Sequence, residues 1–415
     1  MRNELQRGMA VVKLFKTGVS FKQFAPALVL VFNSIAWFSI VSIVLGNSID
    51  RLSLAVMPTF ALYGCYYVGS ALSALLGAWL FPRAREKYLL FWILLGTLAS
   101  ALLPTVGSND LSVNMLFSVF LGVSVGLGLP SSLAYFADTA IVENRGRCGG
   151  VVWGAVGSSI LFMGLLVNTL GVSQAFIALS IWRGAGLITF YVLSRFRGKT
   201  QSPTRAISYR VILGRRDVVL YLVPWIMFSL INFAESPILD ALFGIDLHAF
   251  LGLIELAITG FFAIVGGVLA DLVGRKRVVI TGFVVLGVEY ATLSLFSATQ
   301  ASWYVYTVLD GTAWGMFAAV FFMTLWGDLA EEEQKEKYYV LGGLPFLLAG
   351  FLPVLVKPLV GGIETVTAFS LASFFLFLAV LPLMYAPETL PEKKIKEMEL
   401  RSYAEKAKKI KEKYA

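Results

Sequence analysis

Long apolar stretches separated by short polar breaks run through the whole sequence. Each is close to the roughly 20 residues that a helix needs to cross about 30 Å of hydrocarbon. A backbone surrounded by lipid must satisfy its own hydrogen bonds, so the stretches are predicted to be transmembrane helices. There are twelve, at 24–46, 53–81, 88–107, 111–138, 148–171, 173–195, 218–242, 249–272, 278–298, 301–330, 338–361 and 365–386.

The longest polar break falls between the sixth and seventh stretches and divides the chain into six helices plus six. We therefore expect four parts: a first six-helix bundle, a cytoplasmic linker, a second six-helix bundle and a charged tail, at 1–195, 196–217, 218–386 and 387–415. The sequence thus predicts an all-α integral membrane protein. Its composition agrees, because 58 % of its residues are hydrophobic and only 14 % are charged, whereas soluble chains carry about 25 % charged residues.

The net charge of +8 follows the predicted topology. With the N-terminus inside, 31 of the 34 Lys and Arg residues fall in the N-terminal segment, the inner loops, the linker and the tail; only Arg51, Arg183 and Lys357 fall elsewhere. Short cytoplasmic loops concentrate positive charge in this way. We expect a multi-pass plasma-membrane protein with both termini in the cytoplasm, basic segments facing anionic lipid, and no binding of nucleic acid.

The loop between the eighth and ninth stretches combines glycines, a carboxylate and three cations. Asp271 ends one predicted helix, where the helix dipole disfavours it unless a cation or a neighbouring helix N-terminus compensates. The pattern resembles the signature loop of the major facilitator superfamily of secondary transporters, and an ordinary positive loop that only sets topology is the alternative. The resemblance implies two six-helix bundles and a cytoplasmic gate formed by Gly267, Asp271, Gly274, Arg275, Lys276 and Arg277.

A shift of 190 residues relates the two halves. It takes Arg85 to Arg275, Asp138 to Asp328, and Arg145 to Lys335. Internal duplication of this kind is common in transporters. The first copy of the loop is altered, because Phe81 stands where Asp271 stands in the second copy, and this puts the first-half gate in doubt.

A second motif follows the fourth stretch. It resembles the pattern of sugar porters and metabolite–proton symporters, with a carboxylate at a helix end and an arginine seven residues later. The Pro-Glu-Thr sequence that begins at Pro387 is a weaker likeness to sugar porters. The resemblance implies that these residues bridge neighbouring helices at the cytoplasmic face, with Asp328 and Lys335 nearby: Asp138, Arg145, Gly146 and Arg147.

Small residues at four-residue spacing predict close helix packing. The fifth stretch carries Gly150 and Gly154, and the second carries Gly69, Ser73 and Gly77. Ordinary core packing could explain the same spacing.

Polar residues inside the predicted helices are costly and therefore mark candidate functional positions. The resemblance implies that helices 1, 4, 7 and 10 line a central cavity and that helices 3, 6, 9 and 12 face outward. Glu235 and Asp310 rank first as proton carriers, and Glu255 is next. We expect Glu289 and Arg183 to face lipid unless they are paired. The candidates for solute or proton binding are Glu235, Asp310, Glu255, Asn232, Asn33, Arg183 and Lys357.

Other functional classes lack their sequence features. There is no nucleophile–base set and no phosphate loop, the only histidine is His248 in a predicted outer loop, and Cys65 and Cys148 lie in or beside apolar stretches. We therefore expect no enzyme activity, no cofactor and no metal, and a monomer. The sequence predicts a secondary transporter of a small polar solute such as a sugar or an organic acid, coupled to protons. The alternatives are a multidrug or cation efflux antiporter and a non-transporting sensor of the same fold.

Overall fold

The structure is a computed structural model that describes residues 19–80, 85–102, 110–195, 207–391, 395–397 and 400. Eleven helical segments in these ranges are long and apolar enough to cross a membrane. The first half contains α2 (Phe21–Arg51), α3 (Val56–Trp79), α4 (Arg85–Leu102), α5 (Leu111–Gly126), α6 (Leu129–Thr139), η2 (Val142–Asn144), α7 (Arg145–Asn168) and α8 (Val172–Ser194).

The second half begins after the linker with a short helix, α9 (Tyr209–Gly214). It continues with α10 (Arg216–Phe243), α11 (Ile245–Val273), α12 (Arg275–Phe296), α13 (Gln300–Phe317), the π-helix η3 (Ala318–Thr324), α14 (Leu325–Ala330), α15 (Lys335–Ala349), α16 (Leu352–Val356), η4 (Lys357–Gly362), α17 (Thr365–Leu378) and α18 (Val380–Tyr385). His248, expected in a loop, lies in the first turn of α11, because that helix begins four residues before the apolar stretch predicted it.

Several predicted helices are interrupted. The fourth breaks at the turn of Leu127 and Gly128 into α5 and α6, and the tenth contains the π-helix η3 between α13 and α14. The third predicted helix corresponds to α4. It is not among the eleven segments above, because it is short and begins with three charged residues, Arg85, Glu86 and Lys87. Its predicted end at 103–107 lies outside the described residues. The apolar stretches therefore located the long helices, but not the breaks within them or the short helix α9 in the linker.

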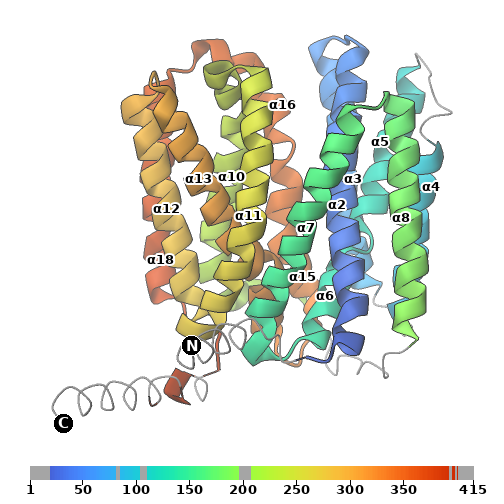
Figure 1. The fold of residues 1–415 in the computed structure, drawn as a ribbon, viewed down its shortest axis with the longest axis vertical. Helices are drawn as coiled ribbons and strands as arrows, with labels where there is room; N and C mark the ends of the chain where they lie inside the picture. Colours follow the sequence, from blue (N-terminus) through green and yellow to red (C-terminus); the bar gives the residue numbers. More distant parts are fainter. Residues whose placement is uncertain are drawn as a thin grey trace, which may run out of the picture.

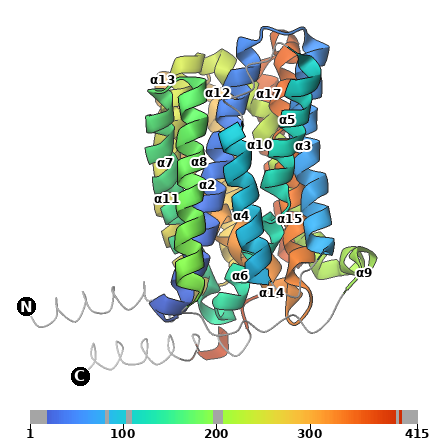
Figure 2. The same ribbon diagram turned by 90° about the vertical axis from the view of Figure 1, so that its right-hand side faces the viewer.

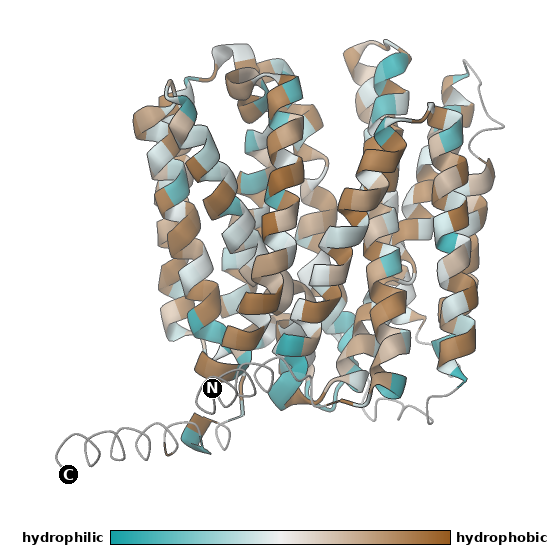
Figure 3. Cartoon of the chain, in the orientation of Figure 1, coloured by the Kyte–Doolittle hydropathy of each residue, from teal (hydrophilic) through white to brown (hydrophobic). Residues whose placement is uncertain are grey.

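The helices form two bundles that stand side by side (Figure 1). Helices α2–α8 make one bundle, and α10–α18 make the other; Figure 2 shows the first from its outer side. In Figure 1 the bundles approach each other in the lower half and separate towards the top. Figure 3 shows apolar residues along the length of the helices. Large apolar side chains such as Leu72, Phe162 and Phe374 are 59–62 % exposed, as expected of a surface that faces lipid.

The closest contact between the bundles is that of α7 with α11. A Cβ atom added to Gly267 would lie 2.2 Å from the carbonyl oxygen of Gly146, and one added to Gly150 would lie 2.4 Å from that of Ala263. Neither position has room for a side chain, so the two backbones touch directly. A Cβ atom added to Gly77 would lie even closer, 1.8 Å from the carbonyl oxygen of Leu127. The prediction of close helix packing from small residues is confirmed at these positions.

Candidate functional site

Ion pairs join the two bundles at the end that is drawn lowest in Figure 1, which we call the ion-pair face. Asp271, at the end of α11, is fully buried. Its carboxylate accepts hydrogen bonds from the backbone N–H groups of Gly146 (3.0 Å) and Arg147 (2.9 Å), at the start of α7 in the other bundle. The guanidinium of Arg275 lies 3.2 Å away. A cation and a neighbouring helix N-terminus therefore both compensate this carboxylate, as its position at a helix end requires.

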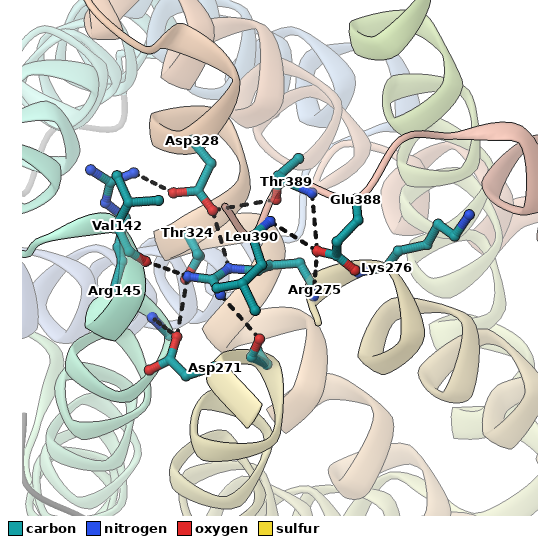
Figure 4. Close-up of polar contacts among 12 residues, drawn as sticks. Val142, Arg145, Asp271, Arg275, Lys276, Thr324, Asp328, Glu388, Thr389 and Leu390 are labelled. Carbon is teal, nitrogen blue, oxygen red and sulfur yellow. Dashed lines mark hydrogen bonds and ion pairs between the residues drawn. The ribbon is translucent and has the colours of Figure 1, made fainter. Parts of the chain in front are cut away.

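Asp328 lies between two arginines (Figure 4). Arg275 donates from Nε to Asp328 at 3.1 Å, and Arg145 of the first bundle pairs with the other carboxylate oxygen. Arg275 also donates to the carbonyl oxygen of Val142, again across the bundles, at 2.5 Å. All three charged side chains are nearly inaccessible to solvent. The resulting charge-assisted network links the bundles only while they are close together.

The segment after α18 completes this network. The carboxylate of Glu388 accepts from the backbone N–H groups of Arg275 (2.8 Å) and Lys276 (3.2 Å), and thus caps the start of α12. Gly274 has φ +104°, and a Cβ atom there would lie 2.3 Å from Glu388, so only glycine fits. Thr389 donates to Asp328 at 3.3 Å. Glu388 and Thr389 belong to the Pro-Glu-Thr sequence noted above, but the sequence did not identify them as residues of the gate.

The first half carries a matching network at an offset of 190 residues. Arg85 pairs with Asp138, and Lys335 of the other bundle lies 2.9 Å from Asp138, just as Arg275 and Arg145 flank Asp328. Phe81 lies outside the described residues. Arg85 nevertheless has a second carboxylate, because Glu336 of the other bundle lies 2.6 Å from its guanidinium with a fully buried side chain. Glu336 thus pairs with Arg85 in the way that Asp271 pairs with Arg275.

Four carboxyl groups lie inside the second bundle, one each on α10, α11, α12 and α13. We call Glu235, Glu255, Glu289 and Asp310 the carboxylate cluster. Glu235, Glu289 and Asp310 are at most 5 % exposed. Glu255 is half-buried, and Glu255, Glu235 and Glu289 are each close enough to Asp310 to interact with it electrostatically. The sequence suggested only Glu235 as a neighbour of Asp310.

Tyrosines surround this cluster. The hydroxyl of Tyr290 lies near Glu235, and that of Tyr306 lies near Asp310. The expectation that Glu289 faces lipid was wrong, because α12 turns this side chain inward, where it is 0 % exposed. In the part of the chain that the structure describes, no group of three or more His, Cys, Asp or Glu residues has the arrangement of a metal site.

Arg183 was also expected to face lipid and instead lies inside the first bundle. It is 0 % exposed and donates to Asn33 (3.2 Å) and Ser34 (2.5 Å) on α2. The rings of Trp37 and Trp92 lie 4.9 and 4.5 Å from its guanidinium carbon. Two aromatic faces and two neutral oxygens replace part of the water around the cation, while its Nε and Nη2 atoms have no hydrogen-bond partner within the described residues.

The remaining candidates lie apart from these groups. Asn232, on α10, accepts a hydrogen bond from the indole of Trp314, on α13, at 3.0 Å, and thus links these two helices of the second bundle. Lys357 is exposed at the end of the bundles opposite the ion-pair face. Arg277 is exposed at the ion-pair face. The sequence therefore named residues of four separate places: the ion-pair face, the carboxylate cluster, the Arg183 site and the opposite end.

Two hollows lie between the bundles. The central cavity has a volume of about 50 Å³ and is lined from both bundles by α2, α3, α6, α7, η3 and α15. At the end opposite the ion-pair face, a wider vestibule of about 310 Å³ is lined by residues that include Asp50, Tyr63, Asp240 and Lys357. The bundles are thus held together at one face and hollowed at the other.

Comparisons with known proteins support the fold. No protein-family model and no curated protein matches the sequence. Among solved structures, the proton:xylose symporter XylE of the major facilitator superfamily, bound to 6-bromo-6-deoxy-D-glucose, is similar with a TM-score of 0.65 over 89 % of this chain and 96 % of that one, at 15 % identity. The human organic anion transporter MFSD10 (TETRAN) is similar with a TM-score of 0.63 over 87 % and 99 %, at 13 % identity. The chain therefore has the fold of the major facilitator superfamily.

Proposed function

We propose that this protein is a secondary transporter that works by alternating access. The observation that carries the proposal is the asymmetry between the two ends of the bundles: ion pairs close one face, while a vestibule of about 310 Å³ opens at the other. A rocking motion of the bundles would break the ion pairs and close the vestibule. The positive-inside distribution of Lys and Arg supports placing the ion-pair face in the cytoplasm. We further propose that the protein lies in the plasma membrane and acts as a monomer.

The ion-pair face has the properties that a gate needs. Its charges are buried, and opening the face would expose both partners of each ion pair to water. Their hydration offsets much of the attraction that is lost. The closed and open states of the face can therefore be close in free energy and interconvert. The glycine contacts of α7 with α11 let these helices pivot at a backbone contact, without large side chains that interlock.

We propose that the carboxylate cluster carries the coupling proton. Asp310 is 2 % exposed and interacts electrostatically with Glu255, and a proton shared by these neighbouring carboxyl groups is the one that we propose is carried. Glu235, Glu289, Tyr290, Tyr306 and, more distantly, His248 form the rest of their charged and titratable surroundings. Opening this region to water would allow the proton to leave, and thus would couple proton release to the movement of the bundles.

A flux assay tests both parts of the proposal. Purified protein in liposomes is given an imposed pH gradient, and a lumenal pyranine signal reports proton movement on addition of D-xylose, L-lactate, tetraphenylphosphonium or γ-aminobutyrate. One of these solutes should move protons through the wild-type protein. Asp310→Asn should abolish this movement while counterflow exchange of the solute continues, and Glu364→Gln, which alters an exposed carboxylate, should change neither.

Two outcomes would contradict the proposal. Coupled proton movement that survives in both Asp310→Asn and Glu255→Gln would place the carrier elsewhere. Binding without flux of any solute would favour a sensor of the same fold over a transporter.

A further inference from the structure

We infer that the solute is a small zwitterion, with one ammonium and one carboxylate group, and that it binds in the vestibule between Asp50 and Lys357. This inference rests on the proposed transport function and names the solute class of that transporter. It is carried by two oppositely charged side chains that line one hollow from different bundles and form no ion pair within the described residues.

The vestibule has walls from both bundles. Asp50, at the end of α2, and Tyr63, on α3, line it from the first bundle. Asp240, on α10, and Lys357, at the start of η4, line it from the second. Its volume of about 310 Å³ is at the lower end of the roughly 300–1,000 Å³ of small-molecule sites. The vestibule therefore has room for a small solute, whereas the central cavity, at about 50 Å³, is much smaller.

Prolines place Lys357 at this wall. The segment that follows α15 is not one continuous α-helix, because proline lacks a backbone N–H group and clashes with the preceding turn. Pro353 lies in the first turn of α16, and Pro358 lies in the first turn of η4. Both prolines line the vestibule together with Lys357. The interrupted helix thus ends at the hollow, with a lysine at the interruption.

The two carboxylates of the vestibule differ in their partners. Asp240 already contacts His248, whose Nδ1 lies 2.6 Å from its Oδ1. Asp50 forms no ion pair within the described residues, and neither does Lys357. Tyr63 is close enough to Asp50 to interact with it electrostatically, but its hydroxyl group is neutral. Within the part of the chain that the structure describes, the vestibule thus presents an unpaired negative charge on the first bundle and an unpaired positive charge on the second.

Closing the vestibule would be unfavourable for these two charges on their own. Water hydrates both in the open state, but the proposed rocking motion would remove much of this water, and a charge that loses its hydration without gaining a partner is destabilising. A zwitterion supplies both partners, its ammonium group to Asp50 and its carboxylate to Lys357, through charge-assisted hydrogen bonds. The solute would then contact both bundles and favour the state in which they close around it.

Solutes of the other classes satisfy these charges less well. An organic anion would pair with Lys357 but would be repelled by Asp50 and Asp240, and an organic cation would pair with Asp50 but leave Lys357 without a partner. A sugar offers only neutral hydroxyl groups to both charges, and hydrogen bonds between ionised partners are the stronger ones. The vestibule therefore favours a zwitterion over the solutes that the sequence left open.

Binding of ω-amino acids tests this inference. The purified full chain in nanodiscs is titrated at neutral pH by isothermal calorimetry with β-alanine, γ-aminobutyrate and δ-aminovalerate, which differ in the separation of their charges. The alkylamine and the alkyl carboxylate of the same length as the tightest binder each carry one of its two charges. Lys357→Gln and Asp50→Asn remove the charges of the vestibule. Arg51→Gln and Asp246→Asn are the controls, because both residues are exposed at the same end and neither lines the vestibule.

We expect saturable binding of one of the amino acids, about tenfold tighter than that of the alkylamine or the alkyl carboxylate, the effect of one added charge-assisted contact. Lys357→Gln should weaken binding of the amino acid about tenfold and should not weaken the alkylamine, because an ammonium group gains nothing from Lys357. Asp50→Asn should weaken the amino acid and the alkylamine but not the carboxylate. The two controls should bind as the wild type does, and thermal melting checks that all four variants fold.

Absence of amino acid binding, or equally tight binding of the alkylamine, would overturn the inference. Binding of the amino acid that is unchanged in Lys357→Gln or in Asp50→Asn would overturn it too. The result is separable from the test of transport. Coupled flux of D-xylose or L-lactate without saturable amino acid binding would uphold transport and refute the zwitterion. Amino acid binding that requires both charges, without flux of any solute, would uphold the site and refute transport.

Discussion

Replacing Asp271 by asparagine should open the ion-pair face. The carboxylate accepts two backbone N–H groups of α7 at 3.0 and 2.9 Å, across the boundary between the bundles, and it is fully buried there. An asparagine of the same shape keeps one carbonyl oxygen, but it turns an NH₂ donor towards one of those N–H groups or towards Arg275. It also removes the negative charge that the start of α7 favours.

The size of the effect follows from these contacts. A hydrogen bond to a charged group contributes about 1.5–3 kcal/mol, and the two bonds to α7 are not additive. We therefore expect Asp271→Asn to destabilise the closed state of the ion-pair face by about 2–4 kcal/mol. In the open state the side chain is hydrated, so little is lost there. At about 1.4 kcal/mol per tenfold change, the ratio of closed to open protein should fall about 30- to 700-fold.

A cysteine in the central cavity can report this change. Gly343 lines the cavity, and an added Cβ atom meets nothing within 4 Å, so Gly343→Cys is introduced into a Cys65→Ser, Cys148→Ser background that leaves it as the only cysteine. A charged maleimide added from the ion-pair face should label this cysteine slowly in that background and at least tenfold faster with Asp271→Asn. Asp217→Asn is the control, because Asp217 pairs with Arg215 within one bundle.

Unchanged labelling would refute the reasoning. If Asp271→Asn lowers the folded yield and leaves the labelling rate alone, the loop has a structural role and does not hold a gate.

Three further predictions use the same structure. Glu336→Gln should accelerate maleimide labelling less than Asp271→Asn, about five- to thirtyfold, because Arg85 keeps Asp138 after losing Glu336; an effect equal to that of Asp271→Asn would contradict this ranking. Gly267→Ala should lower the melting temperature, because its Cβ atom would lie 2.2 Å from the oxygen of Gly146, whereas Gly343→Ala should not; equal melting temperatures would show that the α7–α11 contact is loose. A cysteine at Asp246, exposed at the end of the bundles opposite the ion-pair face, should be labelled from outside intact cells, and labelling only from inside would reverse the proposed topology.

The sequence predicted the parts of this fold that hydropathy and charge control. Apolar stretches located the helices, because each must be long enough to cross the hydrocarbon. The loop motifs identified Asp271, Arg275, Asp138 and Arg145, which meet at the ion-pair face, because charges at helix ends need partners. The offset of 190 residues also predicted that Lys335 would match Arg145.

The direction of side chains within a helix was not predictable in the same way. Helix α12 is apolar around its whole circumference, so nothing in its pattern indicates that Glu289 points inward. Arg183 was assigned to lipid from the order of the helices, yet the structure buries it against Trp37 and Trp92. Both errors arose because a helix surrounded by apolar groups on all sides carries no amphipathic signal.

Contacts between distant segments were also invisible in the sequence. Glu336 compensates Arg85 from the other half of the chain, and no local pattern links them. The central cavity is apolar because apolar residues from six helical segments meet there, and no local pattern in the sequence brings these segments together.

The distance between the bundles, measured at both faces of one protein, tests the account most directly. Spin labels at Ile141 and Val273 report the ion-pair face, and labels at Val56 and Leu359 report the opposite end; all four positions are 42–63 % exposed. Double electron–electron resonance should show that Asp271→Asn lengthens the first distance and shortens the second. Two distances that stay the same, or that increase together, would contradict alternating access through this gate.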